Sequence, residues 1–319
     1  MIMVWALAGL GLVILLLAGD ALVKGAVNLS LRMGIPALIV SLTIVAFGTS
    51  APEMLISVNA VLDQKPGLAL GNVVGSNTAN ILLVLGIPAI ISGLRTSDCC
   101  AHKTFFFMIA ASVLFIGLAF RGVFDIFAAI VLLAALALVL MDAFREVKAH
   151  RKSITDMPEI DIEEVEGADP DMPWWQILVF LMLGLLGLPL GADMLVDNAS
   201  VIARTYGMSD AMIGLTLVAL GTSLPELATT VMAALRRQAD VAIGNVIGSN
   251  MFNLLAIIGV AALVGPIPVN ANFLTFDLWV MLAASLLLAP FVFLKLDIGR
   301  LWGVILTALY LVYVVIVLA

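Results

Sequence analysis

The chain alternates long apolar runs with short polar breaks over almost its whole length. Because a helix needs about 20 apolar residues to cross a bilayer, we interpret ten of these runs as membrane spans. They cover residues 2–31, 37–62, 68–92, 104–120, 124–141, 174–204, 208–235, 241–265, 273–294 and 301–318. The predicted fold class is therefore an all-α membrane protein with ten transmembrane helices.

The composition supports this interpretation and excludes several classes of protein. Hydrophobic residues make up 63% of the 319 residues and charged residues 12%, with a mean hydropathy of +1.19. A soluble domain carries about 45–50% apolar and about 25% charged residues, so an ordinary cytosolic enzyme, a disordered protein and a nucleic-acid binder are excluded. Cys99 and Cys100 are adjacent and form no disulfide framework. The N-terminus lacks a basic region, which favours a first span over a cleaved signal.

The basic residues predict how the spans are oriented. Three of the 15 Lys and Arg residues, Lys65, Arg121 and Arg204, fall at one set of span ends, and the other twelve fall at the opposite set. By the positive-inside rule, both termini lie outside a plasma (inner) membrane and the 142–173 stretch is cytoplasmic. That stretch begins basic and turns acidic, as a solvated linker does, and it is too short for a separate domain. A regulatory cation site is the alternative interpretation of its charges.

The two halves of the chain carry the same motifs. The run GTSAPE at Gly48–Glu53 returns as GTSLPE at Gly221–Glu226, and Gly71–Asn77 returns as Gly244–Asn250, each at an offset of 173 without a gap. The linker 142–173 therefore separates two five-span repeats, residues 1–141 and 174–319. An odd number of spans inserts the second copy upside down. The copies then face each other across a pseudo-two-fold axis, as in secondary transporters with broken helices at the membrane midplane.

Polar residues of each repeat fall at the predicted midplane. Glu53 and Glu226 lie within about one helical turn of the centre of their spans, and Asn80 and Asn253 lie at the midpoints of the spans that follow. A charge at this depth costs at least about 2.5–3.5 kcal/mol, so an intramembrane carboxylate indicates a functional site. The local alternative is a helix capping box, because Ser50 and Glu53 have the required spacing. A cap does not explain why a break occurs in mid-membrane twice.

The break and the residue types around it favour a hard cation. Pro52 and Pro225 lack an N–H group, so the carbonyls of Gly48 and Gly221 lose their helical donors and need other partners inside the membrane. The available ligands are carboxylate, hydroxyl, amide and carbonyl oxygens, which suit Ca²⁺ and, by the same hardness, Na⁺. We find no nucleotide-binding or catalytic motif, and we therefore expect no cofactor, no ATP dependence and no enzymatic activity.

The paired motifs, GTSAPE with GNVVGSNTAN and GTSLPE with GNVIGSNMFN, resemble the signature repeats of the cation/calcium antiporter superfamily, and prokaryotic sodium/calcium exchangers most closely. The resemblance covers essentially the whole chain. It implies a ten-helix inverted repeat in which the long first and sixth helices slide across an eight-helix core. It also implies a ligand set: the carboxylates of Glu53 and Glu226, the hydroxyls of Ser50, Ser76, Ser223 and Ser249, the main-chain carbonyls of Ala46, Thr49, Ala219 and Thr222, and the amide of Asn80.

Asn253 is the position at which this sequence departs from part of the superfamily. In some members that this chain resembles, including potassium-dependent exchangers, the equivalent residue is Asp. Asn253 therefore argues against a potassium requirement, leaves the Na⁺ stoichiometry open and completes the expected metal-binding set.

The implied function is exchange of Na⁺ for Ca²⁺ by alternating access, with the monomer as the expected functional unit in the bilayer. H⁺/Ca²⁺ exchange through the same glutamates is the first alternative. A gated cation channel and an intramembrane enzyme that uses Asp20 and Asp193 are weaker ones. The aligned Asp20 and Asp193 are more simply interpreted as hydrogen-bonding groups inside the bundle.

Overall fold

The structure is a computed structural model that describes residues 1–96, 101–154, 169, 171–208 and 219–318. In the first half, the α-helices, π-helices (η) and one strand are α1 (Ile2–Met33), α2 (Ala37–Val40), η1 (Ser41–Val45), α3 (Ala46–Thr49), α4 (Ala51–Leu62), α5 (Pro66–Ala79), η2 (Asn80–Val84), α6 (Gly86–Ile91), α7 (His102–Ala119), β1 (Val123–Phe124) and α8 (Ile126–Ile154). In the second half they are α9 (Trp174–Thr205), α11 (Ala219–Gly221), α12 (Leu224–Leu235), α13 (Ala239–Met251), η5 (Phe252–Ile257), α14 (Ile258–Val264), β2 (Ile267–Pro268), η6 (Phe273–Asp277), α15 (Leu278–Leu286), α16 (Ala289–Phe293) and α17 (Arg300–Leu318).

The predicted all-α membrane fold is confirmed, but the count of ten spans is not. Among the described residues, eight helices are long and apolar enough to cross a membrane, and Ala37–Thr49 (α2, η1 and α3) with α4 makes a ninth if this pair, bent by 43°, is taken as one broken span. The expected span 208–235 lies partly outside the described residues, and its described part is α11 and α12. Cys99, Cys100 and most acidic residues of the 142–173 stretch also lie outside the described residues.

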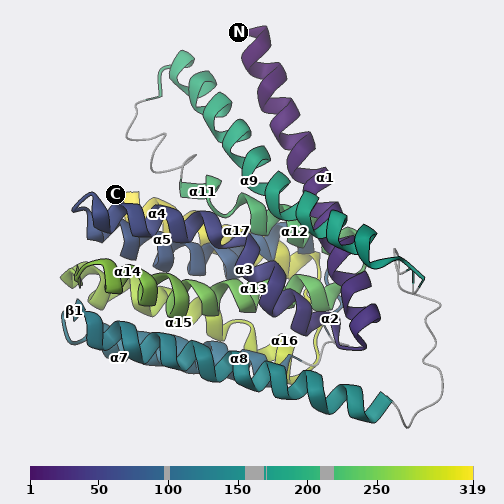
Figure 1. The fold of residues 1–319 in the computed structure, drawn as a ribbon. Coiled ribbons are helices and arrows are strands. Elements are labelled where there is room, and N and C mark those ends of the chain that lie inside the picture. The colour runs from purple at the N-terminus through teal and green to yellow at the C-terminus, as the bar shows by residue number, and fades with distance from the viewer. Residues whose placement is uncertain (97–100, 155–168, 170, 209–218, 319) are drawn as a thin grey trace.

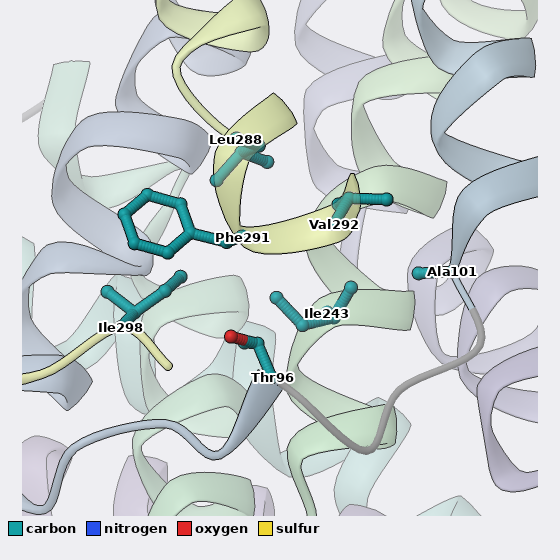
Figure 2. A pocket seen from close by; sticks show the side chains of 7 residues that line it. All are labelled: Thr96, Ala101, Ile243, Leu288, Phe291, Val292 and Ile298. Carbon is teal, nitrogen blue, oxygen red and sulfur yellow. The ribbon is translucent and has the colours of Figure 1, made fainter. Parts of the chain in front are cut away.

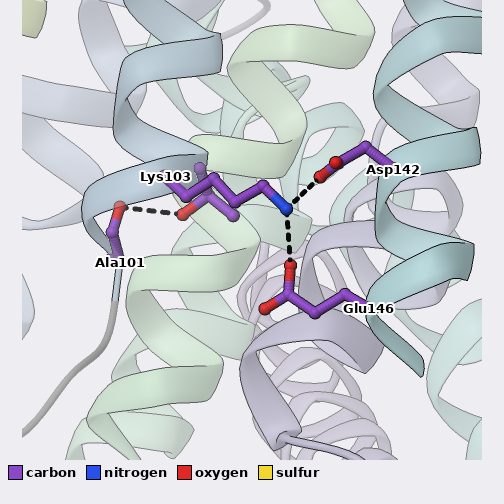
Figure 3. A network of polar contacts seen from close by, with 5 residues as sticks. Ala101, Lys103, Asp142 and Glu146 are labelled. Carbon is purple, nitrogen blue, oxygen red and sulfur yellow. Dashed lines mark hydrogen bonds and ion pairs between the residues drawn. The ribbon is translucent and has the colours of Figure 1, made fainter. Parts of the chain in front are cut away.

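Helix α8 extends further than the hydrophobic pattern predicts. The expected span ends at residue 141, whereas α8 continues to Ile154. An ion-pair network ties this extension to the start of α7: Lys103 Nζ lies 2.5 Å from an Asp142 carboxylate oxygen and 3.1 Å from one of Glu146 (Figure 3). Helices tolerate such polar residues once they leave the apolar layer, and these half-exposed pairs contribute about 0–1 kcal/mol each.

The two longest helices, α1 and α9, lie side by side and cross the other helices at a steep angle (Figure 1). Glycines allow their backbones to touch. A Cβ atom added at Gly11 would lie 2.7 Å from Leu195 N, and one at Gly191 would lie 2.8 Å from Leu15 N. The hydrophobic effect does not drive helices together in lipid, so close van der Waals packing at small residues stabilises such an interface instead. The pair therefore packs as one unit.

The centre of the bundle is formed by α5 and α13 with their π-helical continuations. Every residue of α13 from Val241 to Met251 is buried, whereas α17 presents exposed apolar residues such as Leu301 and Val315 on the outside. A helix that is buried on all sides lies in the interior of the bundle, and an outward apolar face is suited to lipid.

Short backbone pairings, which the hydrophobic pattern does not predict, join the two halves. Strands β1 and β2 pair antiparallel, with Phe124 opposite Ile267, and a second bridge joins Leu94 to Ile298. The offset of 173 maps Leu94 onto Ile267 and Phe124 onto the residue before Ile298. The second bridge is therefore nearly the two-fold equivalent of the first, as an inverted repeat requires.

Helix α1 also contacts α12 through an ion pair. Arg236 Nε lies 2.5 Å from Asp20 Oδ1, and Arg236 Nη2 lies 2.8 Å from Asp20 Oδ2. The expectation that Asp20 bonds inside the bundle is thus confirmed. The offset of 173 places Asp63, in the first repeat, at the position equivalent to Arg236, so the first repeat offers no cation there to Asp193.

We expect Gly11→Val to destabilise the α1–α9 pair, because the added side chain meets the backbone of α9 at 2.7–3.0 Å. Overpacking of this kind costs about 1–3 kcal/mol. The matched control is Gly9→Val on the same helix, where nothing lies within 4 Å of an added Cβ atom. The midpoint of thermal unfolding in detergent should fall for the first variant only, and equal midpoints would contradict the packing described here.

Candidate cation-binding site

The predicted helix breaks occur in both repeats and have the same backbone geometry. Ser50 separates α3 from α4 with φ −85° and ψ 2°, and Ser223 precedes α12 with φ −91° and ψ 2°. Pro52 and Pro225 lie in the first turn of the helix that follows. Proline is tolerated there because its missing N–H is not needed in a first turn.

The two glutamates lie in these first turns and are buried. Glu53 is 1% exposed and Glu226 is not exposed at all. Both helix N-termini carry the positive end of a helix dipole, which stabilises a nearby carboxylate. The capping-box alternative is wrong, because neither Ser50 nor Ser223 makes a side-chain cap hydrogen bond. The serines and glutamates are therefore available for other contacts.

The oxygen atoms around the two breaks have few donors. Ser50 Oγ donates to Glu226 Oε1 over 3.2 Å. Within the described part of the chain, the following buried oxygens have no hydrogen-bond partner: Glu53 Oε1 and Oε2, Glu226 Oε2, Ser223 Oγ, Ser249 Oγ, Asn80 Oδ1 and Asn253 Oδ1. Buried polar atoms are almost always paired, so a group of unpaired oxygens indicates a bound cation. The donor set, all oxygen, fits Ca²⁺ or Na⁺.

Both repeats contribute to this group of oxygens. Helix α12, with Glu226, contacts η2, which begins at Asn80, and α4, with Glu53, contacts η5, which contains Asn253. Thr49 Oγ1 donates to Asn245 Oδ1 over 3.3 Å, across the two halves. The elements that carry the predicted glutamates and asparagines therefore contact each other between the two repeats.

The remaining predicted ligands are placed as follows. Ser76 is buried. The carbonyl of Ala46 accepts from Ser50 N at 3.0 Å, and it shares the single hydroxyl hydrogen of Thr49, 3.3 Å away, with Asn245 Oδ1. Thr222 is half-buried, and Ala219 begins α11, but its side chain is not among those described.

Four further asparagines, which we did not predict as site residues, make hydrogen bonds near the two broken helices or between the repeats. Asn72 Nδ2 donates to Glu53 O and to Ser57 Oγ, over 3.3 and 3.0 Å. Its repeat equivalent, Asn245, donates to Thr230 Oγ1 over 3.3 Å. Asn77 and Asn250 bond to each other's main chain. Two of the four lie in each copy of the GNVxGSN motif, and this repetition is the signal that could have identified them.

An apolar pocket elsewhere in the bundle does not provide a cation site. It lies between the segment after α6, α13 and α16, and Figure 2 shows its lining: Thr96, Ala101, Ile243, Leu288, Phe291, Val292 and Ile298. Its one side-chain hydroxyl, Thr96 Oγ1, donates to Leu296 O over 2.5 Å. The pocket therefore presents carbon atoms to its interior.

Comparison with known proteins identifies the family. The sodium/calcium exchanger protein family matches residues 3–144 and 176–319. The chain is 34% identical to the inner membrane protein YrbG of Escherichia coli, with 98% of this chain and 96% of YrbG covered. It is 32% identical to the sodium/calcium exchanger MaX1 of Methanosarcina acetivorans, with 96% of each chain covered.

A solved structure agrees with this assignment. The sodium–calcium exchanger NCX_Mj, soaked with zero Na⁺ and Ca²⁺, superposes with a TM-score of 0.83 at 32% identity and 99% coverage of both chains. The multi-pass helical fold, the duplicated motif and the sequence match agree, and the chain belongs to the sodium/calcium exchanger family.

Proposed function

We propose that this protein exchanges Na⁺ for Ca²⁺ by alternating access at the site between Glu53 and Glu226. The observation that carries the proposal is the group of buried oxygens without donors, of which three belong to the two carboxylates. An uncompensated charge in a protein interior costs several kcal/mol, and a bound cation removes that cost. The sodium/calcium exchangers among the relatives support the choice of ions.

Charge counting explains why such a site exchanges ions. When ionised, the two glutamates carry two negative charges, which one Ca²⁺ neutralises. Two or three Na⁺ leave a net charge of zero or one positive charge. The empty site keeps two buried negative charges, which are costly to move through an occluded state. Loaded forms therefore switch between inward and outward states and empty forms do not. If three Na⁺ move per Ca²⁺, one charge crosses per cycle, worth about 2.3 kcal/mol per 100 mV.

The packing of α1 and α9 supports a mechanism in which they move together over the other helices. Four glycines join the two backbones closely: Gly11, Gly25, Gly184 and Gly191. One glycine of α1, Gly19, packs in the same way on the core, where an added Cβ would lie 3.0 Å from Ala228 O, and Asp20 adds a side-chain contact. A pair that is rigid internally can slide as one body. Both termini are proposed to lie outside and residues 142–173 in the cytoplasm, from the distribution of basic residues.

The glutamates also suit H⁺/Ca²⁺ exchange, because carboxylates can carry protons. The hydroxyls of Ser50, Ser76, Ser223 and Ser249 favour Na⁺, since such oxygens bind it without a proton. A channel would conduct without a counter-ion. No resident cofactor and no enzymatic step are proposed, and the monomer is the proposed functional unit.

The first test is uptake of ⁴⁵Ca²⁺ into proteoliposomes loaded with Na⁺, compared with vesicles that hold only a pH gradient or neither gradient. We expect uptake only with internal Na⁺. Uptake driven by the pH gradient alone would assign H⁺/Ca²⁺ exchange, and uptake in every vesicle would indicate a channel. Substitution of a residue that supports a metal ligand costs roughly 10–100-fold. Because Glu53→Gln changes a proposed ligand itself, it should lower Ca²⁺ uptake in the same assay by more than that.

The matched control for Glu53→Gln is Asp63→Asn, which removes a carboxylate from the exposed residue that follows the same helix. Its uptake should equal that of the parent. Ca²⁺ should also raise the unfolding temperature of the parent and of the control, but not that of Glu53→Gln, because only bound ligand stabilises. Parental uptake by Glu53→Gln would disprove the site.

Asn253→Asp should change which cations the protein requires. A third carboxylate at the site leaves one negative charge after Ca²⁺ binds, so Ca²⁺ transport should become dependent on a further monovalent cation. The measurement is the Na⁺, K⁺ and pH dependence of uptake. Asn270→Asp adds the same charge at an exposed position and serves as the control. An unchanged cation dependence would show that Asn253 does not determine selectivity.

A further inference from the structure

Two buried asparagines bond reciprocally between the repeats. Asn77 Nδ2 donates to the main-chain carbonyl of Asn250 over 3.2 Å, and Asn250 Nδ2 donates to that of Asn77 over 3.4 Å. The two residues are 173 positions apart, which is the offset of the repeat. A contact in which each residue plays the same part toward the other lies on a two-fold axis. The pair therefore marks the pseudo-two-fold axis of the molecule.

This contact fixes which way the amide of Asn250 points. A main-chain carbonyl can only accept a hydrogen bond, so the group that faces Asn77 O must be the NH₂ of Asn250. Its Oδ1 then points the other way and accepts from Asn80 Nδ2 over 3.1 Å. Asn80 thus uses a donor for this bond, and its Oδ1 stays without a partner among the described residues.

We infer that Asn250 is a positioning residue that turns the amide of Asn80 so that its oxygen, and not its NH₂ group, is presented to the transported cation. The inference rests on the proposed cation site. An amide oxygen is a ligand for Ca²⁺ and Na⁺, whereas an NH₂ group in the same place repels them. Asn250 acts through Asn80, as a hydrogen-bond partner orients a metal ligand from behind.

The first repeat provides an internal comparison, because Asn77 is its equivalent of Asn250. Asn77 has the same residue type, burial and main-chain bond as Asn250. Within the described residues, however, Asn77 Oδ1 has no partner, and neither amide atom of Asn253 has one. Asn77 therefore contributes to the contact on the axis but orients no ligand in this structure. Substitution of Asn77 therefore removes one of the two equivalent bonds between the repeats but removes no bond to a proposed ligand.

The test compares Asn250→Ala with Asn77→Ala in Na⁺-driven Ca²⁺ uptake. We expect Asn250→Ala to raise the KM for Ca²⁺ about tenfold or more, as a lost partner behind a metal ligand does, with little change in maximal rate. Asn77→Ala should leave this KM within about twofold of the parent. Equal effects of the two substitutions would overturn the inference, because they would reflect the shared contact only.

A double-mutant cycle with Asn80→Ala tests whether Asn250 acts through Asn80. In the Asn80→Ala background, Asn250→Ala should change the KM by less than about twofold, since its target is gone. A full additional effect would overturn the inference. An unchanged KM for Asn80→Ala itself would instead remove Asn80 from the proposed site. A raised KM for Asn80→Ala with a parental KM for Asn250→Ala would overturn the positioning role alone.

Asn250→Asp provides the same test if the alanine variant does not reach the membrane. Whether ionised or protonated, a carboxyl group keeps an oxygen that accepts from Asn80 Nδ2, and it keeps the side-chain volume. The KM for Ca²⁺ should therefore not rise. An increase of about tenfold or more would show that the orientation of Asn80 is not what Asn250 controls.

Discussion

The whole architecture depends on two carboxylates that are buried in an apolar helical bundle. Burial of Glu53 and Glu226 is unfavourable unless a cation or a set of donors compensates their charge. Within the described part of the chain few donors reach them: Ser50 Oγ donates to Glu226 Oε1, and both Glu53 carboxylate oxygens and Glu226 Oε2 have no hydrogen-bond partner. The protein supplies oxygen atoms and two helix N-termini instead, and both features favour a bound cation next to the carboxylates. A site of this kind is stable when occupied and costly when empty, which is the physical basis of coupled exchange.

Duplication is the means by which a short sequence builds this site. Each repeat supplies a broken helix with its glutamate and, in the next helix, an asparagine where the α-helix changes to a π-helix. Such π-helical segments are frequent at functional sites. The broken helix of one repeat packs against the π-helix of the other. Neither repeat could form the site alone, because the proposed ligands of each repeat pack against helices of the other.

The sequence predicted the parts of this structure that depend on local pattern. Length and apolarity located most spans within a few residues, and the repeated motif identified Glu53 and Glu226 as buried neighbours. The extension of α8 escaped prediction because polar residues continue a helix beyond the membrane without an apolar signal.

The capping-box alternative failed for a different reason. Spacing along one chain does not show that Ser50 bonds to a glutamate 176 positions away. Nor does a motif show which of its asparagines bind the ion and which bond to each other, as Asn77 and Asn250 do. Those assignments depend on contacts between the repeats, which only the three-dimensional arrangement provides.

The two repeats differ in bonding where their residue types agree. Ser50 bonds to Glu226, but within the described residues Ser223 Oγ has no partner. The asparagines differ in the same way: Asn80 bonds to Asn250, whereas their repeat equivalents, Asn253 and Asn77, do not bond to each other. The residue types agree at these positions, so in the alternating-access cycle proposed above the two halves would exchange these bonds.

The ion pair between Asp20 and Arg236 is an asymmetry of sequence, because the residue equivalent to Arg236 in the first repeat is Asp63. No exchange of conformation between the halves can recreate this pair on the opposite side. In an alternating-access cycle it therefore contributes its free energy to one state only. In that proposed cycle, bonds between identical residues would keep the two states close in energy, and residues that differ between the repeats, such as Arg236 and Asp63, would decide which state predominates.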